Sequence, residues 1–94
     1  MKLKDCFINF NDQLVMFKFV SDCGTSIYLE DFINSSSAFL DKFYNLFGSF
    51  EVDLVYIHND YFKIVLKFDV SNLEEILDVL FAFGSYEVVY AWLC

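Results

Sequence analysis

The sequence predicts an α+β fold, a two-layer sandwich of a mostly antiparallel sheet and two helices. Segments in which apolar and polar residues alternate predict strands, and two longer segments in which apolar residues recur at every third or fourth position predict helices. The composition agrees with a packed core, because 57% of the 94 residues are hydrophobic and 21% are aromatic. That apolar content excludes a disordered chain, and the length fits one globular domain covering residues 1–94.

The N-terminal segment, residues 4–20, is expected to form a hairpin about Asn11-Asp12, a pair that tolerates the backbone angles of a tight turn. A two-residue turn at this point sets Ile8 opposite Val15 on the face expected to be buried, and Asp5 opposite Lys18 on the other. The alternation therefore predicts that the first two strands are neighbours.

Two interpretations are open for Thr25–Leu29: a third strand, which we favour, or the beginning of a long helix. The helix that follows is expected to run from Asp31 to Phe47, because one apolar stripe has alternating spacings of four and three. Gly48 comes directly after it, where a left-handed helix cap places glycine. The stripe consists of Leu29, Ile33, Ser36, Leu40, Phe43 and Phe47.

A second hairpin is predicted from Phe50–Ile57 and Tyr61–Val70, with the three-residue loop 58–60 between them. A two-residue loop would place both acidic residues of the first strand on the apolar face, which is unfavourable. The longer loop sets Glu51 opposite Lys67 instead. It aligns Phe50, Val52, Leu54 and Tyr56 with Phe68, Leu66, Ile64 and Phe62.

The strongest local signal is Ser71-Asn72-Leu73-Glu74, which matches a capping box at the start of a helix. This helix is expected to end at Gly84. The last segment, Tyr86–Leu93, is predicted to be a strand that is central or covered, because both of its faces are apolar apart from Glu87. The residues of the helix that are expected to point inward are Leu73, Ile76, Leu77 and Leu80.

The predicted order of elements is ββ(β)αββαβ. Without its first strand, this order resembles the ferredoxin-like fold, βαββαβ, and the resemblance rests on the order of the elements alone. An N-terminal hairpin would extend such a sheet. The helical connection between the last two strands has the length of a right-handed parallel crossover.

The protein is strongly acidic: fourteen Asp and Glu residues stand against six Lys, for a formal net charge of −8. A chain without clustered cations is disfavoured as a direct nucleic-acid binder. A basic partner surface is the expected counterpart, and a solvated face that only maintains solubility is the alternative. The residues expected to contact the partner are Glu51, Asp53, Asp69, Glu74, Glu75, Asp78, Glu87 and Trp92.

Catalytic, metal and cofactor motifs are not found in the sequence. His58 is the single histidine and lies in a predicted loop whose Asn and Asp neighbours are ordinary turn residues. The three cysteines, Cys6, Cys23 and Cys94, have the number and spacing of neither a disulfide framework nor a zinc site, and they favour a reducing cytoplasm. Apolar segments fall short of the roughly 20 residues of a membrane helix, so a membrane partner is not expected.

These observations favour a non-enzymatic protein that inhibits a larger basic protein or nucleoprotein complex, with carboxylates taking the place of nucleic-acid phosphates. Exposed aromatic side chains would anchor the contact. Small acidic inhibitors of host defence from phages and mobile elements, anti-CRISPR proteins among them, are of this kind, and a phage-encoded chain would act in the host cytoplasm. The alternative is a homo-oligomeric structural or regulatory domain, for instance a dimer. An enzyme that uses His58 is the least favoured hypothesis.

Overall fold

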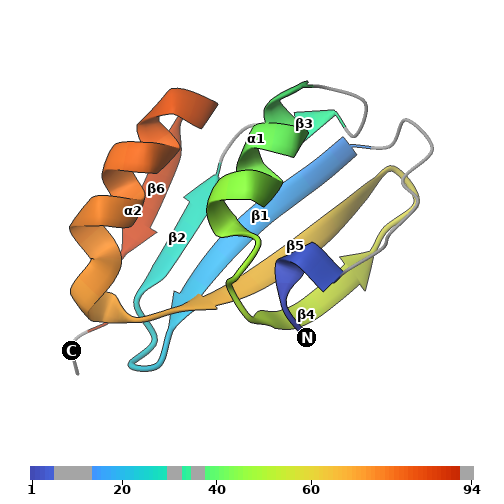
Figure 1. The fold of residues 1–94 in the computed structure, drawn as a ribbon. Helices are drawn as coiled ribbons and strands as arrows, with labels where there is room; N and C mark the ends of the chain where they lie inside the picture. Colours follow the sequence, from blue (N-terminus) through green and yellow to red (C-terminus); the bar gives the residue numbers. More distant parts are fainter. Residues whose placement is uncertain (6–13, 30–32, 35–37, 92–94) are drawn as a thin grey trace.

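The computed structural model describes residues 1–5, 14–29, 33–34 and 38–91. One layer is a sheet, and the other consists of the helices α1 (Ala38–Phe47) and α2 (Leu73–Leu80), which cover the same face of the sheet (Figure 1). This confirms the predicted α+β class with two helices. The strands are β1 (Leu14–Ser21), β2 (Ser26–Leu29), β3 (Ile33–Asn34), β4 (Val52–Ile57), β5 (Tyr61–Phe68) and β6 (Tyr86–Val89), and the short 3-10 turns are η1 (Leu3–Asp5), η2 (Val70–Asn72) and η3 (Phe81–Phe83).

The strands are arranged in the order β4-β5-β1-β2-β6, and β3 also pairs with β1. β1 and β5 are parallel over eight consecutive pairs, from Leu14 beside Tyr61 to Ser21 beside Phe68. The other pairings between the described strands are antiparallel. The sheet is therefore mixed, and its longest pairing is the parallel one.

The position of β1 shows that the predicted N-terminal hairpin is wrong. Val15 lies between β5 on one side and β3 on the other, so no edge of β1 is left there for the expected partner Ile8. Lys4, expected to begin the first strand, lies in η1, and the expected turn at Asn11-Asp12 lies outside the described residues. Alternation identifies the apolar face of a strand but not the neighbour that pairs with it.

The ferredoxin-like arrangement is not confirmed. The sheet does hold β1 parallel to β5, but β2 lies between β1 and β6 as a strand additional to the four of the βαββαβ order. The connection through α2 does join parallel strands, because β6 has the same direction as β5, and it passes over both β1 and β2.

The region before α1 contains less helix than predicted. β2 confirms the strand interpretation of Thr25–Leu29, and β3 follows it, so the helix expected from Asp31 begins only at Ala38. Residues 30–32 and 35–37 lie outside the described residues. Ile33 pairs with Val15 of β1, and this long-range pairing of two β-branched residues was not evident from local spacing.

Gly48 follows α1 as expected, but for a different physical reason. Among the described residues, left-handed backbone occurs at Gly24 and Gly84 and not at Gly48. A Cβ atom on Gly48 would lie 2.5 Å from the carbonyl oxygen of Tyr44. The carbonyl of Gly48 also accepts a hydrogen bond of 2.8 Å from the Lys4 amide. The close approach of the backbone, not a positive φ angle, therefore requires glycine here.

Residues 58–60 separate β4 from β5, but the predicted three-residue loop is wrong: the His58 amide donates a hydrogen bond of 2.9 Å to the Tyr61 carbonyl and Ile57 pairs with Phe62, so the turn consists of residues 59 and 60. The predicted register is confirmed at the start of β4, where Val52 pairs with Leu66. Beside this pair, the Lys67 amide donates a hydrogen bond of 2.9 Å to the Glu51 carbonyl. The parity argument was therefore correct for the end of the hairpin that carries charge on both strands.

The expected pairing is wrong between Asp53 and the loop. Leu54 pairs with Val65 instead of its expected partner, because a β-bulge at Asp53 shifts the register by one residue. As a result Val55 packs on the core, while Leu54 and Tyr56 lie on the opposite face and are 50% and 45% exposed. The bulge, and not the length of the loop, keeps the Asp53 carboxylate out of the core.

The predicted burial of α2 is confirmed, but its capping box is wrong. Ile76 and Leu80 are buried, and Leu73 and Leu77 pack against the same core. Asn72 occupies the N-cap position of α2 without a side-chain hydrogen bond, and the preceding turn η2 is capped by an aspartate instead of by a serine. Helical geometry thus begins one turn earlier than the sequence motif indicated.

The final strand is shorter and more peripheral than predicted. β6 ends at Val89 and is the last strand of the described path, next to β2, so its expected central position is wrong. Tyr86 and Val88 pack on the core, whereas Glu87 and Val89 are exposed on the other face. Residues 92–94 lie outside the described residues.

Phenylalanine rings join α1 to the sheet. The rings of Phe43 and Phe17 are stacked with centroids 3.9 Å apart, and Phe43 also contacts Phe83 edge-on at 5.4 Å. Phe19 meets Phe47 edge-on at 5.1 Å. Such aromatic pairs add roughly 0.5–1.5 kcal/mol each beyond the burial of their area. Stacked and edge-on phenylalanine rings therefore hold α1 against β1.

Replacing Phe43 by alanine tests this description. Phe43 is fully buried, so the substitution is expected to lower the free energy of unfolding by about 3–5 kcal/mol, measured by urea denaturation. Phe81→Ala is the matched control, because Phe81 is 79% exposed, and its effect should stay below about 0.5 kcal/mol. Equal effects of the two substitutions would contradict the assignment of the core.

Candidate functional site

An acidic groove lies at the end of the sheet where β1 and β5 finish and β4 begins. It has a volume of about 660 Å³. Four carboxylates line it, those of Asp22, Glu51, Asp53 and Asp69, and Lys67 is the one lysine among the described residues of its lining. The remaining lining residues are Val20, Ser21, Ser49, Phe50, Phe68 and Asn72.

The parallel pairing of β1 and β5 brings Asp22 and Asp69 to the same edge of the sheet. Ser21 and Phe68 are the last paired residues of the two strands, and each is followed directly by one of these aspartates. Asp22 stands exposed in a turn in which the Gly24 amide donates to the Ser21 carbonyl over 3.1 Å. Gly24 has a φ angle of 93°, which a residue with a side chain rarely adopts.

Cys23 lies in the same turn and is disulfide-bonded, which contradicts the expectation of reduced cysteines. Its partner lies outside the described residues. The Sγ atom of Cys23 is also 3.3 Å from Oγ of Ser21. The turn that carries Asp22 is therefore held by a covalent bond in addition to its hydrogen bonds.

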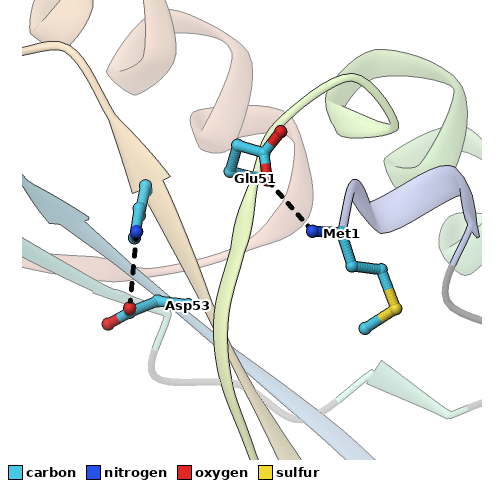
Figure 2. A network of polar contacts seen from close by, with 4 residues as sticks. Met1, Glu51 and Asp53 are labelled. Carbon is cyan, nitrogen blue, oxygen red and sulfur yellow. Dashed lines mark hydrogen bonds and ion pairs between the residues drawn. The ribbon is translucent and has the colours of Figure 1, made fainter.

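Glu51 and Asp53 reach the groove from the start of β4, and each has a cationic partner (Figure 2). Oε2 of Glu51 lies 3.2 Å from the Met1 amino nitrogen, and Oδ1 of Asp53 lies 3.8 Å from Nζ of Lys67. The paired groups are well exposed to solvent, so each pair contributes at most about 1 kcal/mol to stability. These contacts orient the carboxylates more than they stabilise the fold.

Asp69 is held by the segment that follows β5. Its Oδ1 atom accepts hydrogen bonds from the Ser71 amide at 3.0 Å and from the Ser71 hydroxyl at 2.9 Å. These bonds, the backbone bond first, lower the pKa of the Asp69 carboxyl because they favour its charged form. Asp69 thus performs the capping that the sequence motif assigned to Ser71.

The structure brings part of the predicted contact set together. Three of its residues line the groove: Glu51, Asp53 and Asp69. Three others are exposed on α2, which begins directly after the groove residue Asn72: Glu74, Glu75 and Asp78. The groove and this side of α2 therefore form one region of negative charge.

Two predicted residues do not belong to this region as described. Glu87 lies in β6 beside Tyr28 of β2, across the sheet from β4 and on the face opposite the helices. Trp92 lies outside the described residues. Conversely, Asp22 was missed, because its relation to Asp69 becomes visible only once the parallel pairing of their strands is known.

In the described part of the chain, the charged groups that line the groove are four carboxylates and one lysine. Among the described residues, no three His, Cys, Asp and Glu side chains are grouped so that they could hold a metal ion. The ring of His58 stacks on Tyr61 with centroids 4.3 Å apart, on the hairpin loop away from the groove. The helices in the described ranges are too short or too polar to span a membrane.

Comparisons with protein-family models, with curated proteins and with solved structures find no match to this chain.

Substituting Asp69 tests its hydrogen bonds. Its pKa is lowered from 3.8 on folding, so its contribution to stability is present above that value and is lost as the pH falls through the folded-state pKa. Asp69→Asn should therefore melt below the wild type at pH 7, and the difference should shrink as the pH is lowered below about 4. A melting difference that is constant from pH 7 to pH 2, measured by circular dichroism, would contradict this role.

Proposed function

We propose that the protein is a non-enzymatic inhibitor that binds a larger, basic, nucleic-acid-handling protein or nucleoprotein complex. The observation that carries the proposal is the convergence of Asp22, Glu51, Asp53 and Asp69 on one groove from separate segments of the chain. Fixed carboxylates in a concave surface complement protruding lysine and arginine side chains, which a partner normally uses to hold phosphates. The inhibitor would occupy that surface in place of nucleic acid.

The arrangement of the acidic region supports steering as well as contact. Glu74, Glu75 and Asp78 on α2 extend the negative charge of the groove along one side of the molecule. A field of one sign accelerates encounter with an oppositely charged partner, and it is screened by salt. We therefore expect tight binding at low ionic strength and a steep loss of affinity as salt is raised.

Inhibitors of host defence encoded by phages, of the anti-CRISPR type, are the class that this surface fits best. Members of that class act in the host cytoplasm on nucleoprotein complexes whose channels are basic. Exposed aromatic side chains, with Phe81 at 79% and Tyr90 at 66%, are available as anchors outside the groove. The proposal needs no bound cofactor or metal.

A capture experiment with charge-matched variants tests the proposal. The full chain is immobilised and exposed to a nuclease-treated lysate of the source organism or of its host, and retained proteins are eluted with a salt gradient. A basic nucleic-acid-binding protein should be retained at about 0.05 M salt and released well below 1 M. Glu51→Gln with Asp69→Asn should reduce its retention about tenfold or more.

The control has the same change in net charge at other positions. Asp41→Asn with Asp60→Asn neutralises two exposed carboxylates, on α1 and in the hairpin loop, outside the groove. This pair should leave retention within about twofold of the wild type, because neither residue belongs to the groove or to α2. If the two double variants behave alike, or if no basic protein is retained at low salt, the proposal is wrong.

A homodimer is the second candidate. It is favoured by the position of β6 at the end of the described strand path and by the exposure of Val89, the last residue of β6. Association through this strand would extend the sheet across a two-fold axis. If the dimer is the functional state, sedimentation velocity over a dilution series should show a dimer that Tyr90→Ser weakens about tenfold. Tyr56→Ser on the far strand β4 serves as the control. A monomer at all concentrations would exclude this candidate.

A further inference from the structure

The face of the sheet that is turned away from α1 and α2 collects positive charge. Along β1 and β5, alternate residues point away from the core, and three of them are lysines: Lys18, Lys63 and Lys67. These are half of the six lysines in a chain of net charge −8. The face opposite the helices therefore carries three lysines together with Glu87 and the Asp53 partner of Lys67, while α2 carries acidic residues.

Aromatic rings lie among these lysines. Nζ of Lys18 is 4.8 Å from the ring centroid of Tyr28, and Nζ of Lys63 is 5.9 Å from that of Tyr56. The His58 and Tyr61 rings are stacked at 4.3 Å with an interplanar angle of 21°. Tyr56 lies 6.4 Å from His58. Three rings thus stand next to one another at the loop end of the β4–β5 hairpin.

A hollow of about 310 Å³ separates the rings from the middle of the sheet. Its floor includes Leu54 and the buried Val65. Two lysines, one carboxylate, aromatic rings and aliphatic groups therefore meet in one concavity, which is at the small end of the range of ligand pockets, roughly 300–1,000 Å³. Its lining consists of Lys18, Val20, Asp53, Leu54, Tyr56, His58, Tyr61, Lys63 and Val65.

We propose that this hollow binds a nucleoside phosphate, with the base stacked against the His58, Tyr56 and Tyr61 rings and the phosphate beside Lys18 and Lys63. A base offers a planar π-face to such rings, and a phosphate is an anion that lysine ammonium groups complement. The volume suits one nucleotide. The overall negative charge of the protein opposes a long polyanion, so the ligand is a free nucleotide or the end of a single strand.

The charge of the face also argues against other occupants. The same face of a second copy would bring lysine against lysine, which is unfavourable. An acidic peptide would satisfy the lysines but would leave the stacked rings without a planar partner. The site is separate from the acidic groove in its chemistry, so this inference does not depend on the proposed inhibitory function.

Nuclear magnetic resonance titration of the full chain tests the site. The ¹⁵N-labelled protein is titrated at about 0.05 M salt with adenosine monophosphate, adenosine, inorganic phosphate, a short single-stranded oligoadenylate and a glutamate-rich peptide. Saturable shifts are expected with the monophosphate at the amides of residues 54–65 and around Lys18. Adenosine and phosphate alone should each bind at least about tenfold more weakly. Tighter binding of the oligoadenylate would identify a strand end as the source, and equal binding a free nucleotide.

Substitutions test the contact with the phosphate and the contact with the base separately. Lys63→Gln should weaken binding of the monophosphate about fivefold to tenfold and leave binding of adenosine unchanged. Tyr61→Leu should weaken both about tenfold. Lys42→Gln on α1 removes the same charge from the helical side and should change neither. Thermal unfolding of each variant confirms that it is folded.

Several results would overturn the inference. These are the absence of saturable shifts up to about 10 mM monophosphate, shifts that map to the helices, equal binding of inorganic phosphate and the nucleotide, and equal binding of the acidic peptide. Equal weakening of monophosphate binding by Lys63→Gln and Lys42→Gln would also overturn it, because the loss would then depend on the net charge of the protein and not on the position of Lys63. None of these results would bear on capture of a basic partner by the acidic groove.

Discussion

β1 and β5 run side by side in the same direction for eight residues, and this pairing positions nearly everything else in the molecule. It aligns the apolar faces of the two strands beneath α1, so that the phenylalanine core can form. It also places the carboxyl ends of both strands at one edge, where the next residues are Asp22 and Asp69. The groove exists because two strands that are far apart in the sequence end together.

The same pairing explains why the two faces of the sheet differ. Residues of one parity on β1 and β5 are sealed by the helices, and residues of the other parity are left on the opposite face, where Lys18 lies beside Val65 and Lys63 beside Met16. Because the parallel register is continuous, the lysines of two strands come into one area. Within a net charge of −8, acidic residues lie at one edge and on α2, and three lysines lie together on the sheet face that also carries Glu87.

The sequence predicted those parts of the fold that depend on neighbouring residues. The inward face of α2 and the strand nature of Thr25–Leu29 follow from local periodicity. The partner of β1, the position of β6 and the start of α1 depend on pairings between distant segments, which alternation alone does not specify. For the same reason, single acidic residues were recognised, but Asp22 and the grouping with Asp69 were not.

Asp53 belongs to both concave surfaces of the protein, since it lines the acidic groove and also the hollow among the tyrosines. Its partner Lys67 stands at the same boundary. Ligands at the two surfaces would share this wall, and any change in affinity that occupancy of one surface causes at the other must be reciprocal, by the same factor in both directions. The bulge in β4 thus places the Asp53 carboxylate between a groove that would bind a cationic partner and a hollow that would bind an anionic ligand. Binding at one surface can therefore influence binding at the other through this residue.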